Sequence, residues 1–234
     1  MIIPTYWAKG TYKGQDAEGN ELTLQAWGWS RDSQAAALEL GTARAKRAGE
    51  RLASGKRRDS YDYLDCPLHE EIVRTISCAG EETAVITRNR YGALVLNAAA
   101  VCFIDVDFPP PRAHGFLDAL KLLFSASWRQ ARAKAQQEET LQGVRQWSQA
   151  NPKHSFRLYR TAAGLRLLFT DGLYDPTSAT VHDLLEGLGS DPLYRRLTLK
   201  QQCFRARLTP KPWRCGCAYP PHQYPWQKPA DEAA

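Results

Sequence analysis

The sequence predicts an α+β protein, in which helices cover a β-sheet and a β-hairpin with a helix comes first in the chain. Short apolar or alternating segments, which are typical of strands, occur both before and after a long helical stretch in the middle of the chain. Of the 234 residues, 43% are hydrophobic and 24% are charged. A chain of this size and composition can bury a core without disulfides.

The N-terminal segment, residues 1–58, is expected to form two strands and a helix. Tyr6–Tyr12 and Glu21–Trp29 are rich in aromatic and β-branched residues, and turn-forming residues separate them. Asp32 or Ser33 caps an alanine-rich helix that ends at Gly55. The outer face of this helix could contact nucleic acid, or it could simply face solvent. Its basic residues are Arg44, Lys46, Arg47 and Arg51, followed directly by Lys56, Arg57 and Arg58.

A core over residues 59–212 comes next, and a tail over residues 213–234 is rich in Pro, Trp and Cys. Strands flank a long helix in the core and a hairpin follows that helix, which indicates an RRM-like sheet covered by helices. The expected elements are, in order, a polar loop (Arg58–Leu68), a short helix (His69–Ser77), three strands (Thr83–Thr87, Ala93–Leu96, Val101–Val106), a helix from about Gly115 to Gln149 with a break near Gln136, two strands (Ser155–Thr161, Leu165–Phe169) and two helices (Ser178–Leu188, Leu193–Leu199).

The balance of charge favours phosphate-bearing partners. Lys and Arg number 31 against 25 Asp and Glu, which gives a net charge of +6 and an isoelectric point near 9.0. This excess is too small for a histone-like protein. No apolar run approaches the length of a membrane span, and the first residues lack the basic region and long apolar stretch of a signal peptide. We therefore expect a cytoplasmic protein with no membrane partner.

Two carboxylates lie near the end of the most apolar strand of the predicted sheet. The segment Val101–Phe108 is almost continuously apolar except for Asp105 and Asp107. Residues i and i+2 of a strand point to the same face, with Cα atoms about 7 Å apart. Two like charges at this spacing repel unless a cation lies between them, and Mg²⁺ or Mn²⁺ with oxygen ligands is the natural one. The alternative is a strand end at which both aspartates are hydrated.

Arginines flank the turn of the following predicted hairpin. Arg160 ends the first strand, small residues up to Gly164 form the turn, and Arg166 lies in the second strand. If Arg160 and Arg166 lie on one side of the hairpin, they can grip a cluster of phosphate oxygens. Gly164 would let the backbone approach that ligand closely. The alternative is an ordinary hairpin with exposed arginines.

A basic strip follows late in the chain. Asp191 begins a helical turn, and the segment after that helix carries Arg205, Arg207 and Lys211. Arg205 and Arg207 share a face if this segment is a strand, with Lys211 just beyond it. Such a strip can hold a nucleic-acid backbone or the tail of a triphosphate. It could equally be a basic edge strand that resists aggregation.

Taken in this order, the three segments resemble the archaeo-eukaryotic primase superfamily, and within it the bacterial and plasmid primase-polymerases. The resemblance covers Val101–Lys211 and leaves out the N-terminal hairpin and helix. It implies an RRM-like catalytic core that binds two divalent metal ions and a nucleoside triphosphate, and that makes or extends a primer on a DNA or RNA template. The family also suggests a role in DNA replication of a plasmid or another mobile element.

The resemblance assigns roles to individual residues. The family has a histidine at the position of Arg166, and an arginine there would hold phosphate in a different geometry. The matching positions are Asp105 and Asp107 for the metal-binding motif, Thr161, Gly164 and Arg166 for the nucleotide-binding motif, and Asp191, with Asp171 and Asp183 as substitutes, for the third acidic motif.

These features lead to two hypotheses of different class. The first is a metal-dependent nucleotidyltransferase, in which Asp105 and Asp107 hold Mg²⁺ or Mn²⁺ and a hydroxyl group attacks in line with the leaving pyrophosphate. The alternative is a catalytically degenerate relative that only binds nucleic acid or nucleotide. The two aspartates favour the first, and Arg166 in place of histidine favours the second. In either case, the residues expected to neutralise triphosphate and template are Arg160, Arg166, Arg205 and Lys211.

The six cysteines raise a third hypothesis, a zinc-stabilised interaction module in the tail. Cys203, Cys215, Cys217 and His222 could supply a Cys₃His ligand set. However, Cys-x-Cys is not the usual spacing of zinc ligands, so we expect little or no bound zinc. Cysteines among apolar residues are expected to be buried thiols, and these are Cys66, Cys78 and Cys102.

Overall fold

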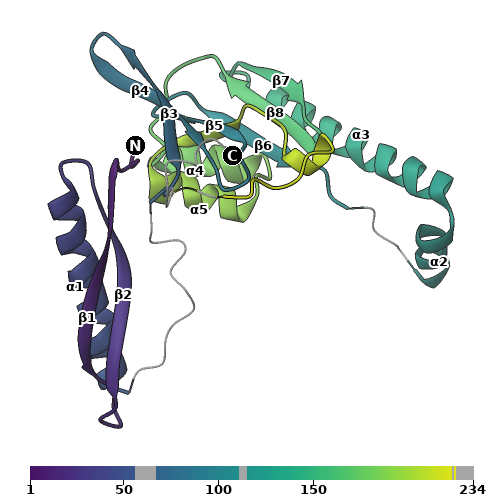
Figure 1. The fold of residues 1–234 in the computed structure, drawn as a ribbon. Coiled ribbons are helices and arrows are strands. Elements are labelled where there is room, and N and C mark those ends of the chain that lie inside the picture. Colours follow the sequence, from purple (N-terminus) through teal and green to yellow (C-terminus); the bar gives the residue numbers. More distant parts are fainter. Residues whose placement is uncertain (56–66, 111–114, 223, 225–234) are drawn as a thin grey trace. The chain divides into compact units, whose positions relative to one another are not determined.

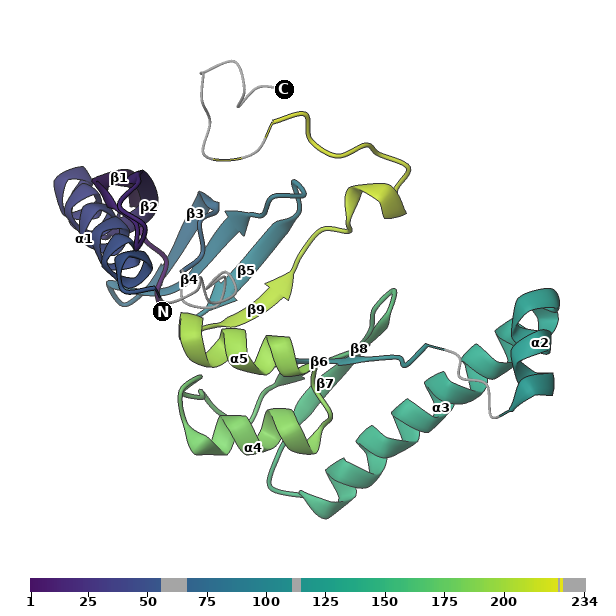
Figure 2. The ribbon, with the colours of Figure 1, turned by 90° about the horizontal axis from the view of Figure 1, so that it is seen from below.

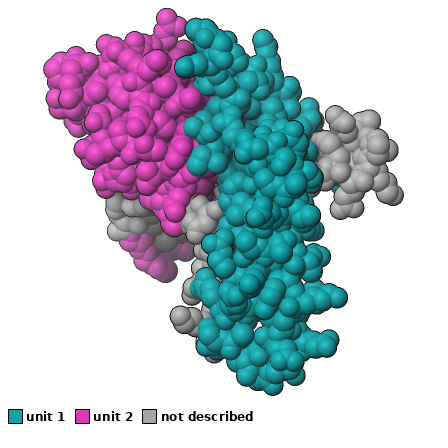
Figure 3. Space-filling view, turned by 90° about the vertical axis from the view of Figure 1, so that its left-hand side faces the viewer, with its two compact units in different colours: residues 1–96, 207–234 teal, residues 97–206 magenta. Residues whose placement is uncertain are grey.

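A computed structural model describes residues 1–55, 67–110, 115–222 and 224 of the chain. Its helices and three antiparallel sheets confirm the predicted α+β class. The chain divides into two compact units, which comprise residues 1–96 with 207–234 (unit 1) and residues 97–206 (unit 2) (Figure 3). The predicted core over residues 59–212 thus takes in parts of both units, and the boundary predicted at residue 58 lies outside the described residues.

The N-terminal hairpin and helix form as predicted. β1 (Tyr6–Gln15) pairs with β2 (Glu21–Ser30), and α1 (Gln34–Ala53) lies along both strands (Figure 1, Figure 2). Ser33 caps α1, because its side chain accepts a hydrogen bond from the backbone N–H of Ala36 at 3.1 Å. The buried residues of α1 are all small: Ala37, Gly41, Ala45 and Gly49.

Glycines bring the backbone of α1 against the backbone of the hairpin. A Cβ atom at Gly10 would lie 1.9 Å from the backbone nitrogen of Thr42. A Cβ atom at Gly28 would lie 2.0 Å from the carbonyl oxygen of Ala37. Atoms cannot approach this closely, so a side chain at either position would push the helix away from the strands.

The basic face of α1 is present as predicted. Lys46, Arg47 and Arg51 are exposed. Arg44 is half-buried, and its guanidinium carbon lies 4.5 Å from the centroid of the Trp29 ring, in a cation–π contact. The remaining basic residues of this expected surface, Lys56–Arg58, lie outside the described part of the chain, as does most of the predicted polar loop that follows them.

The predicted short helix over His69–Ser77 is wrong, because this segment forms the strand β3 (Glu71–Cys78). β3 pairs antiparallel with β4 (Glu81–Arg88). Ile, Val and Thr make up half of β3, and such β-branched residues favour an extended chain. The two turn residues, Ala79 and Gly80, have φ angles of 51° and 86°, the left-handed pair that a tight hairpin turn requires.

Two further strands join β3 and β4 in a four-stranded sheet of order β3-β4-β5-β9. They are β5 (Leu94–Ala98) and β9 (Phe204–Arg207). Cys78, which was expected to be a buried thiol, is exposed at the end of β3. Cys102 is buried as expected, and Cys66 lies outside the described residues.

Unit 2 contains the strand with the two aspartates. β6 (Phe103–Asp107) pairs with β8 (Gly164–Phe169), and β8 pairs with β7 (Phe156–Arg160), all antiparallel. This confirms that the aspartate strand lies beside the predicted hairpin. The interior position predicted for the aspartate strand is wrong, since β6 is an outer strand in the sheet order β6-β8-β7.

The predicted long helix breaks earlier than expected. It forms α2 (Phe116–Phe124) and α3 (Ala126–Ala150), and the break falls at Ser125 instead of near residue 136. Ser125 caps α3 by accepting a hydrogen bond from the backbone N–H of Trp128 at 3.2 Å. A serine cap satisfies a backbone donor at a helix start, so it stabilises a new helix at this point.

The core of unit 2 lies on one face of the β6-β8-β7 sheet. α3 and α4 (Ala179–Gly187) pack there, and α5 (Pro192–Gln201) follows α4 in the chain. The buried side chains of this core include Ile104, Val106, Val144, Leu165, Leu167, Phe169, Val181, Leu184 and Leu185. Among the described residues, every helix is too short or too polar to span a lipid bilayer.

Candidate functional site

Charged side chains occupy the face of the β6-β8-β7 sheet opposite the apolar core that it forms with α3 and α4. Ile104 and Val106 point into the core, so Asp105 and Asp107 point to the opposite face, as predicted for residues i and i+2. In the register of the sheet, Asp105 lies opposite Arg166 and Asp107 lies opposite Gly164. The first aspartate of the pair therefore has an arginine as its direct neighbour across the strands.

Arg166 and Asp105 form a bidentate ion pair. Arg166 Nε donates a hydrogen bond to Asp105 Oδ1 at 2.6 Å, and Arg166 Nη2 donates to Asp105 Oδ2 at 2.8 Å. The side chain of Arg166 is 18% exposed and that of Asp105 is 35% exposed. The hydrogen bond that Arg166 donates to Asp105 raises the pKa of Arg166 further above its already high value. The guanidinium is thus the counter-ion of the carboxylate that the resemblance assigns to a metal.

This pair changes the conditions for metal binding. Asp105 and Asp107 share a face, and two carboxylates are suitable oxygen ligands for Mg²⁺ or Mn²⁺. However, a metal ion at Asp105 would have to replace the two hydrogen bonds from Arg166. In the described part of the chain, no three His, Cys, Asp or Glu side chains gather to hold a metal ion. Further ligands would have to come from water or from the phosphates of a nucleotide.

Arg160 does not join Arg166, so the condition under which both could bind one phosphate cluster is not met. The register pairs Arg160 with Leu165 and Arg166 with Tyr159. Leu165 belongs to the core, so Arg160 points to the helix side of the sheet and Arg166 points away from it. A shift of one residue in register reverses the face of a side chain, and the sequence of this turn did not determine that register.

Gly164 and Thr161 have structural roles at the hairpin turn. A Cβ atom at Gly164 would lie 2.2 Å from the carbonyl oxygen of Val106, so the glycine admits the backbone of β6 rather than that of a ligand. The backbone N–H of Thr161 donates to the carbonyl oxygen of Gly164 at 2.9 Å and closes the turn. Both residues therefore hold β8 against the strand that carries Asp105.

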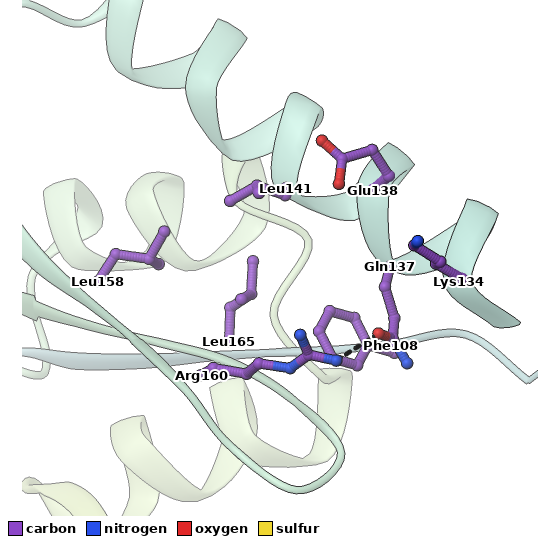
Figure 4. Close-up of a pocket in the computed structure, with 8 residues that line it drawn as sticks. All are labelled: Phe108, Lys134, Gln137, Glu138, Leu141, Leu158, Arg160 and Leu165. Carbon is purple, nitrogen blue, oxygen red and sulfur yellow. Dashed lines mark hydrogen bonds between the residues drawn. The ribbon is translucent and has the colours of Figure 1, made fainter.

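A pocket of about 290 Å³ lies on the helix side of the sheet, next to α3 (Figure 4). Arg160 Nη2 donates a hydrogen bond to Gln137 Oε1 at 2.6 Å within it. Four of its lining side chains are apolar and four are polar or charged. The lining residues are Phe108, Lys134, Gln137, Glu138, Leu141, Leu158, Arg160 and Leu165. The pocket and the Asp105–Arg166 pair thus lie on opposite faces of one sheet.

None of the candidates for a third acidic residue lies on a strand of this sheet. Asp191 caps α5, because its side chain accepts a hydrogen bond from the backbone N–H of Tyr194 at 3.0 Å. Asp171 Oδ2 lies 2.8 Å from His154 Nδ1 and accepts a hydrogen bond from the Tyr174 hydroxyl at 2.8 Å. Asp183 is an exposed residue of α4. Asp191 thus caps a helix, Asp171 is hydrogen-bonded to neighbouring side chains, and Asp183 faces solvent.

Arg205 and Arg207 share a face of β9, as predicted, because Phe204 and Ala206 between them are buried. The strip is nevertheless divided between the two units: Arg205 belongs to unit 2, and Arg207 and Lys211 belong to unit 1. The ammonium group of Lys211 lies 5.1 Å from the centroid of the Trp213 ring.

The candidate zinc ligands differ in exposure. Cys203 is buried in unit 2, whereas Cys215, Cys217 and His222 are exposed in unit 1. The Cys217 thiol points back toward the chain, with Sγ 3.8 Å from the carbonyl oxygen of Cys215. The expectation about zinc stays a prediction.

Tyr194 is a member of the site that sequence reasoning missed. Its hydroxyl donates to the carbonyl oxygen of Phe103 at 2.9 Å, and the backbone N–H of Arg205 donates to the same hydroxyl at 3.3 Å. Burial, and then the nearby charge of Asp105, raise the pKa of Tyr194 above its ordinary value. No motif marks this tyrosine; the only signal is the rule that a buried tyrosine hydroxyl needs a polar partner.

The site is thus described by its own geometry: an Asp-x-Asp strand, an arginine opposite the first aspartate, and a buried tyrosine at the strand edge. Comparisons of the chain with protein-family models, with curated proteins and with solved structures find no match. The resemblance of Val101–Lys211 to primase-polymerases therefore stays a prediction from the sequence.

Proposed function

We propose that this protein binds nucleic acid or nucleotides through a domain of the primase-polymerase type, in which an ion pair blocks the catalytic centre. The observation that carries the proposal is the bidentate pair between Asp105 and Arg166. The resembling family has a histidine at the position of Arg166. Arginine is permanently charged, and its planar fork matches a carboxylate, so it occupies the oxygens that a metal ion would otherwise bind.

The order of the elements supports an RRM-like fold for this domain. From β6 to β9 the chain runs strand, helices, strand, strand, helices, strand, which is the β-α-β-β-α-β order. The Tyr194 hydroxyl links β6, through Phe103, to β9, through Arg205, although the two strands belong to different sheets. The face of the β6-β8-β7 sheet opposite its apolar core corresponds to the face that RRM sheets use to bind nucleic acid.

Side chains on that face suit a ligand with phosphates and bases. Arg157 and Tyr159 are exposed on β7, and both point to the same side as Arg166. Arginine binds phosphate, and an exposed aromatic ring can stack on a base. Unit 2 as a whole contains 14 Lys and Arg against 10 Asp and Glu, so its net charge also favours an anionic ligand.

An ion pair at this position suppresses catalysis for a definite reason. Nucleotidyl transfer requires a metal ion that activates the attacking hydroxyl and neutralises the charge developing on the phosphates. A guanidinium neutralises charge but does not activate a hydroxyl group. With Arg166 in place, the site retains anion binding and loses the metal-dependent step.

The nucleotidyltransferase is the second candidate, favoured by one observation. Asp105 and Asp107 are both retained on the same face of β6, and Asp107 is exposed at the strand end. If a triphosphate draws Arg166 away from Asp105, the two carboxylates become ligands for Mg²⁺ or Mn²⁺. The protein would then be an enzyme that its own nucleotide activates.

A primer-extension assay separates the two candidates. The purified protein is incubated with Mn²⁺, a primed template and nucleoside triphosphates, and binding to the same nucleic acid is measured by fluorescence anisotropy over a range of salt concentrations. We expect binding that weakens with salt, as phosphate contacts require, and no extension. Extension that disappears in an Asp105→Ala/Asp107→Ala variant would establish the enzyme instead. Absence of any binding to nucleic acid or nucleotide would refute both candidates.

A further inference from the structure

Unit 1 carries a group of three aromatic rings, two of them exposed, that the site on unit 2 does not use. Trp213 and Tyr219 are stacked, with ring centroids 5.0 Å apart and an interplanar angle of 27°. Tyr91 meets both rings edge-on, at 5.4 Å from Trp213 and 5.8 Å from Tyr219. Trp213 remains 43% exposed and Tyr219 remains 55% exposed. We call these three residues the aromatic platform.

The platform joins two segments that lie far apart in the sequence. The backbone N–H of Leu208 donates to the carbonyl oxygen of Leu94 at 2.8 Å, and the N–H of Leu94 donates to Thr209 Oγ1 at 2.9 Å. Gly92, with a φ angle of 77°, sits so close to Pro220 that a Cβ atom there would lie 3.0 Å from Pro220 Cγ. Backbone hydrogen bonds and packing between the two segments therefore hold the three rings in position.

Positive charge surrounds the platform. The guanidinium carbon of Arg90 lies 4.7 Å from the centroid of the Tyr91 ring, and Lys211 lies over the ring of Trp213. Arg207 and Arg214 are exposed in the same segment. No Asp or Glu occurs in residues 89–96 or 207–222, the two stretches of sequence that form this surface. These two stretches thus combine aromatic rings with cations and contribute no carboxylate.

From this combination we infer that the aromatic platform binds single-stranded nucleic acid, with bases stacked on its rings and phosphates held by the surrounding arginine and lysine side chains. Every base has a π-face, so stacking on aromatic side chains accepts any sequence, and a basic groove tracks the backbone. The bases of a duplex are already stacked on each other and cannot reach the rings. The platform therefore selects single strands, an inference that rests on the proposed nucleic-acid binding and adds to it the form of the ligand.

The test is fluorescence anisotropy with a labelled oligothymidylate and with a labelled duplex. We expect the full-length protein to bind the single strand more tightly than the duplex at the same salt concentration. Trp213→Ala/Tyr219→Ala should weaken single-strand binding by about tenfold or more, because each stacked base contributes substantially. Trp213→Phe/Tyr219→Phe keeps flat rings and should retain most of the affinity, which separates stacking from general damage to the surface.

Matched controls locate the effect. Tyr6→Ala removes a tyrosine of unit 1 that is 38% exposed but lies outside the platform, and it should leave binding unchanged. Lys211→Ala/Arg214→Ala should reduce both the affinity and its salt dependence, whereas Arg47→Ala/Arg51→Ala on α1 should do neither. If Arg47→Ala/Arg51→Ala lowers the affinity for the single strand and Lys211→Ala/Arg214→Ala does not, the binding site lies on α1 and the inference is wrong.

The outcomes also separate this inference from the proposed function. If the wild-type protein binds nucleic acid and the Trp213→Ala/Tyr219→Ala variant binds equally well, the platform inference is wrong and the proposed function stands. If binding is lost in Arg157→Ala/Arg166→Ala alone, the ligand uses the sheet of unit 2. If the wild type binds no single strand, duplex or nucleotide, both statements are wrong.

Discussion

The hairpin–helix segment of unit 1 and the β6-β8-β7 sheet of unit 2 both pack helices on antiparallel strands, but they do so with different residues. Gly10 and Gly28 bring backbone against backbone, and α1 buries only alanine and glycine against them. The sheet of unit 2 instead meets α3 and α4 through large apolar side chains such as Leu167 and Phe169.

This difference determines what each region can offer to a ligand. Close backbone packing in the hairpin and α1 leaves no room for a side chain at Gly10 or Gly28. In unit 2, the large side chains fill one face of the sheet, and the strand alternation then frees the other face for Asp105, Arg166 and Tyr159. The polar face of the β6-β8-β7 sheet can therefore be used for binding because the opposite face forms the hydrophobic core of unit 2.

The largest effect that we expect is on the side-chain core. Leu167 is fully buried, so Leu167→Ala should lower the free energy of unfolding by about 2–5 kcal/mol, through lost burial and an unfilled cavity. Leu168→Ala, one residue along the same strand and on the opposite face, should cost clearly less. Denaturant unfolding followed by circular dichroism measures both. Equal losses in the two variants would contradict the assignment of faces.

The next effect concerns the backbone packing of unit 1. Gly28→Ala places a methyl group about where Ala37 O and Gly41 N already lie, so we expect a loss of about 1–3 kcal/mol, as for overpacked cores. Hydrogen exchange of the α1 amides reports this local loss directly.

Gly143→Ala is the matched control. Gly143 is exposed in α3, and a Cβ atom there meets nothing within 4 Å. Because alanine is the better helix former, this change should stabilise the protein by up to about 1 kcal/mol. Destabilisation by both changes would mean that glycine positions are uniformly sensitive, and the comparison between the two packing modes would fail.

A smaller effect is expected at the ion pair, where a third of the Asp105 side chain meets water. Asp105→Asn should lower stability by about 1–2 kcal/mol, because Arg166 loses a charged partner while solvent screens part of the loss. Arg166→His should release Asp105 and increase the affinity for Mn²⁺, measured by electron paramagnetic resonance of the bound ion. If Mn²⁺ binds wild type and Arg166→His alike, the ion pair does not control the metal.

The smallest effect is expected at Asp171, and it depends on pH. Desolvation alone would raise the pKa of Asp171, but hydrogen bonds from His154 and Tyr174 outweigh it and hold the pKa below 3.8. A carboxyl group whose pKa is depressed by folding stabilises the protein above its unfolded pKa, and this contribution disappears as the pH falls through the folded pKa.

Thermal unfolding against pH tests this. Asp171→Asn should be less stable than wild type near neutral pH, and the gap should close only below pH 3.8. A gap that is the same at every pH would show that the carboxylate charge makes no contribution.

Local signals in the sequence were sufficient for much of the fold. The hairpin of β1 and β2, the cap at Ser33 and the α+β class follow from turn residues, capping residues and apolar periodicity, and all are confirmed. The prediction of a helix at His69–Ser77 was wrong, although signals for a strand were present in the sequence. Its β-branched residues and the turn at Ala79–Gly80 were the better guide.

The candidate site needed contacts that no local pattern contains. The alternation that puts Asp105 and Asp107 on one face is a property of any strand and could be read from the chain. That Arg166 lies opposite Asp105 depends on the register between β6 and β8, in which the two residues are 61 positions apart in sequence. That Arg160 turns to the other side toward Gln137 depends on the register of the β7-β8 hairpin. One step in that register exchanges the two faces, and only packing of the core selects it.

Composition and periodicity by themselves determined the α+β fold class and the basic net charge of this protein, and they indicated that Asp105 and Asp107 share one face of a strand. The tertiary structure alone decided that an arginine takes the place of a cation at Asp105, and that Trp213 and Tyr219 meet Tyr91 in one exposed surface. The physical reason is the same in both cases. Side chains distant in sequence become partners only when burial of the core fixes which strands and loops lie together.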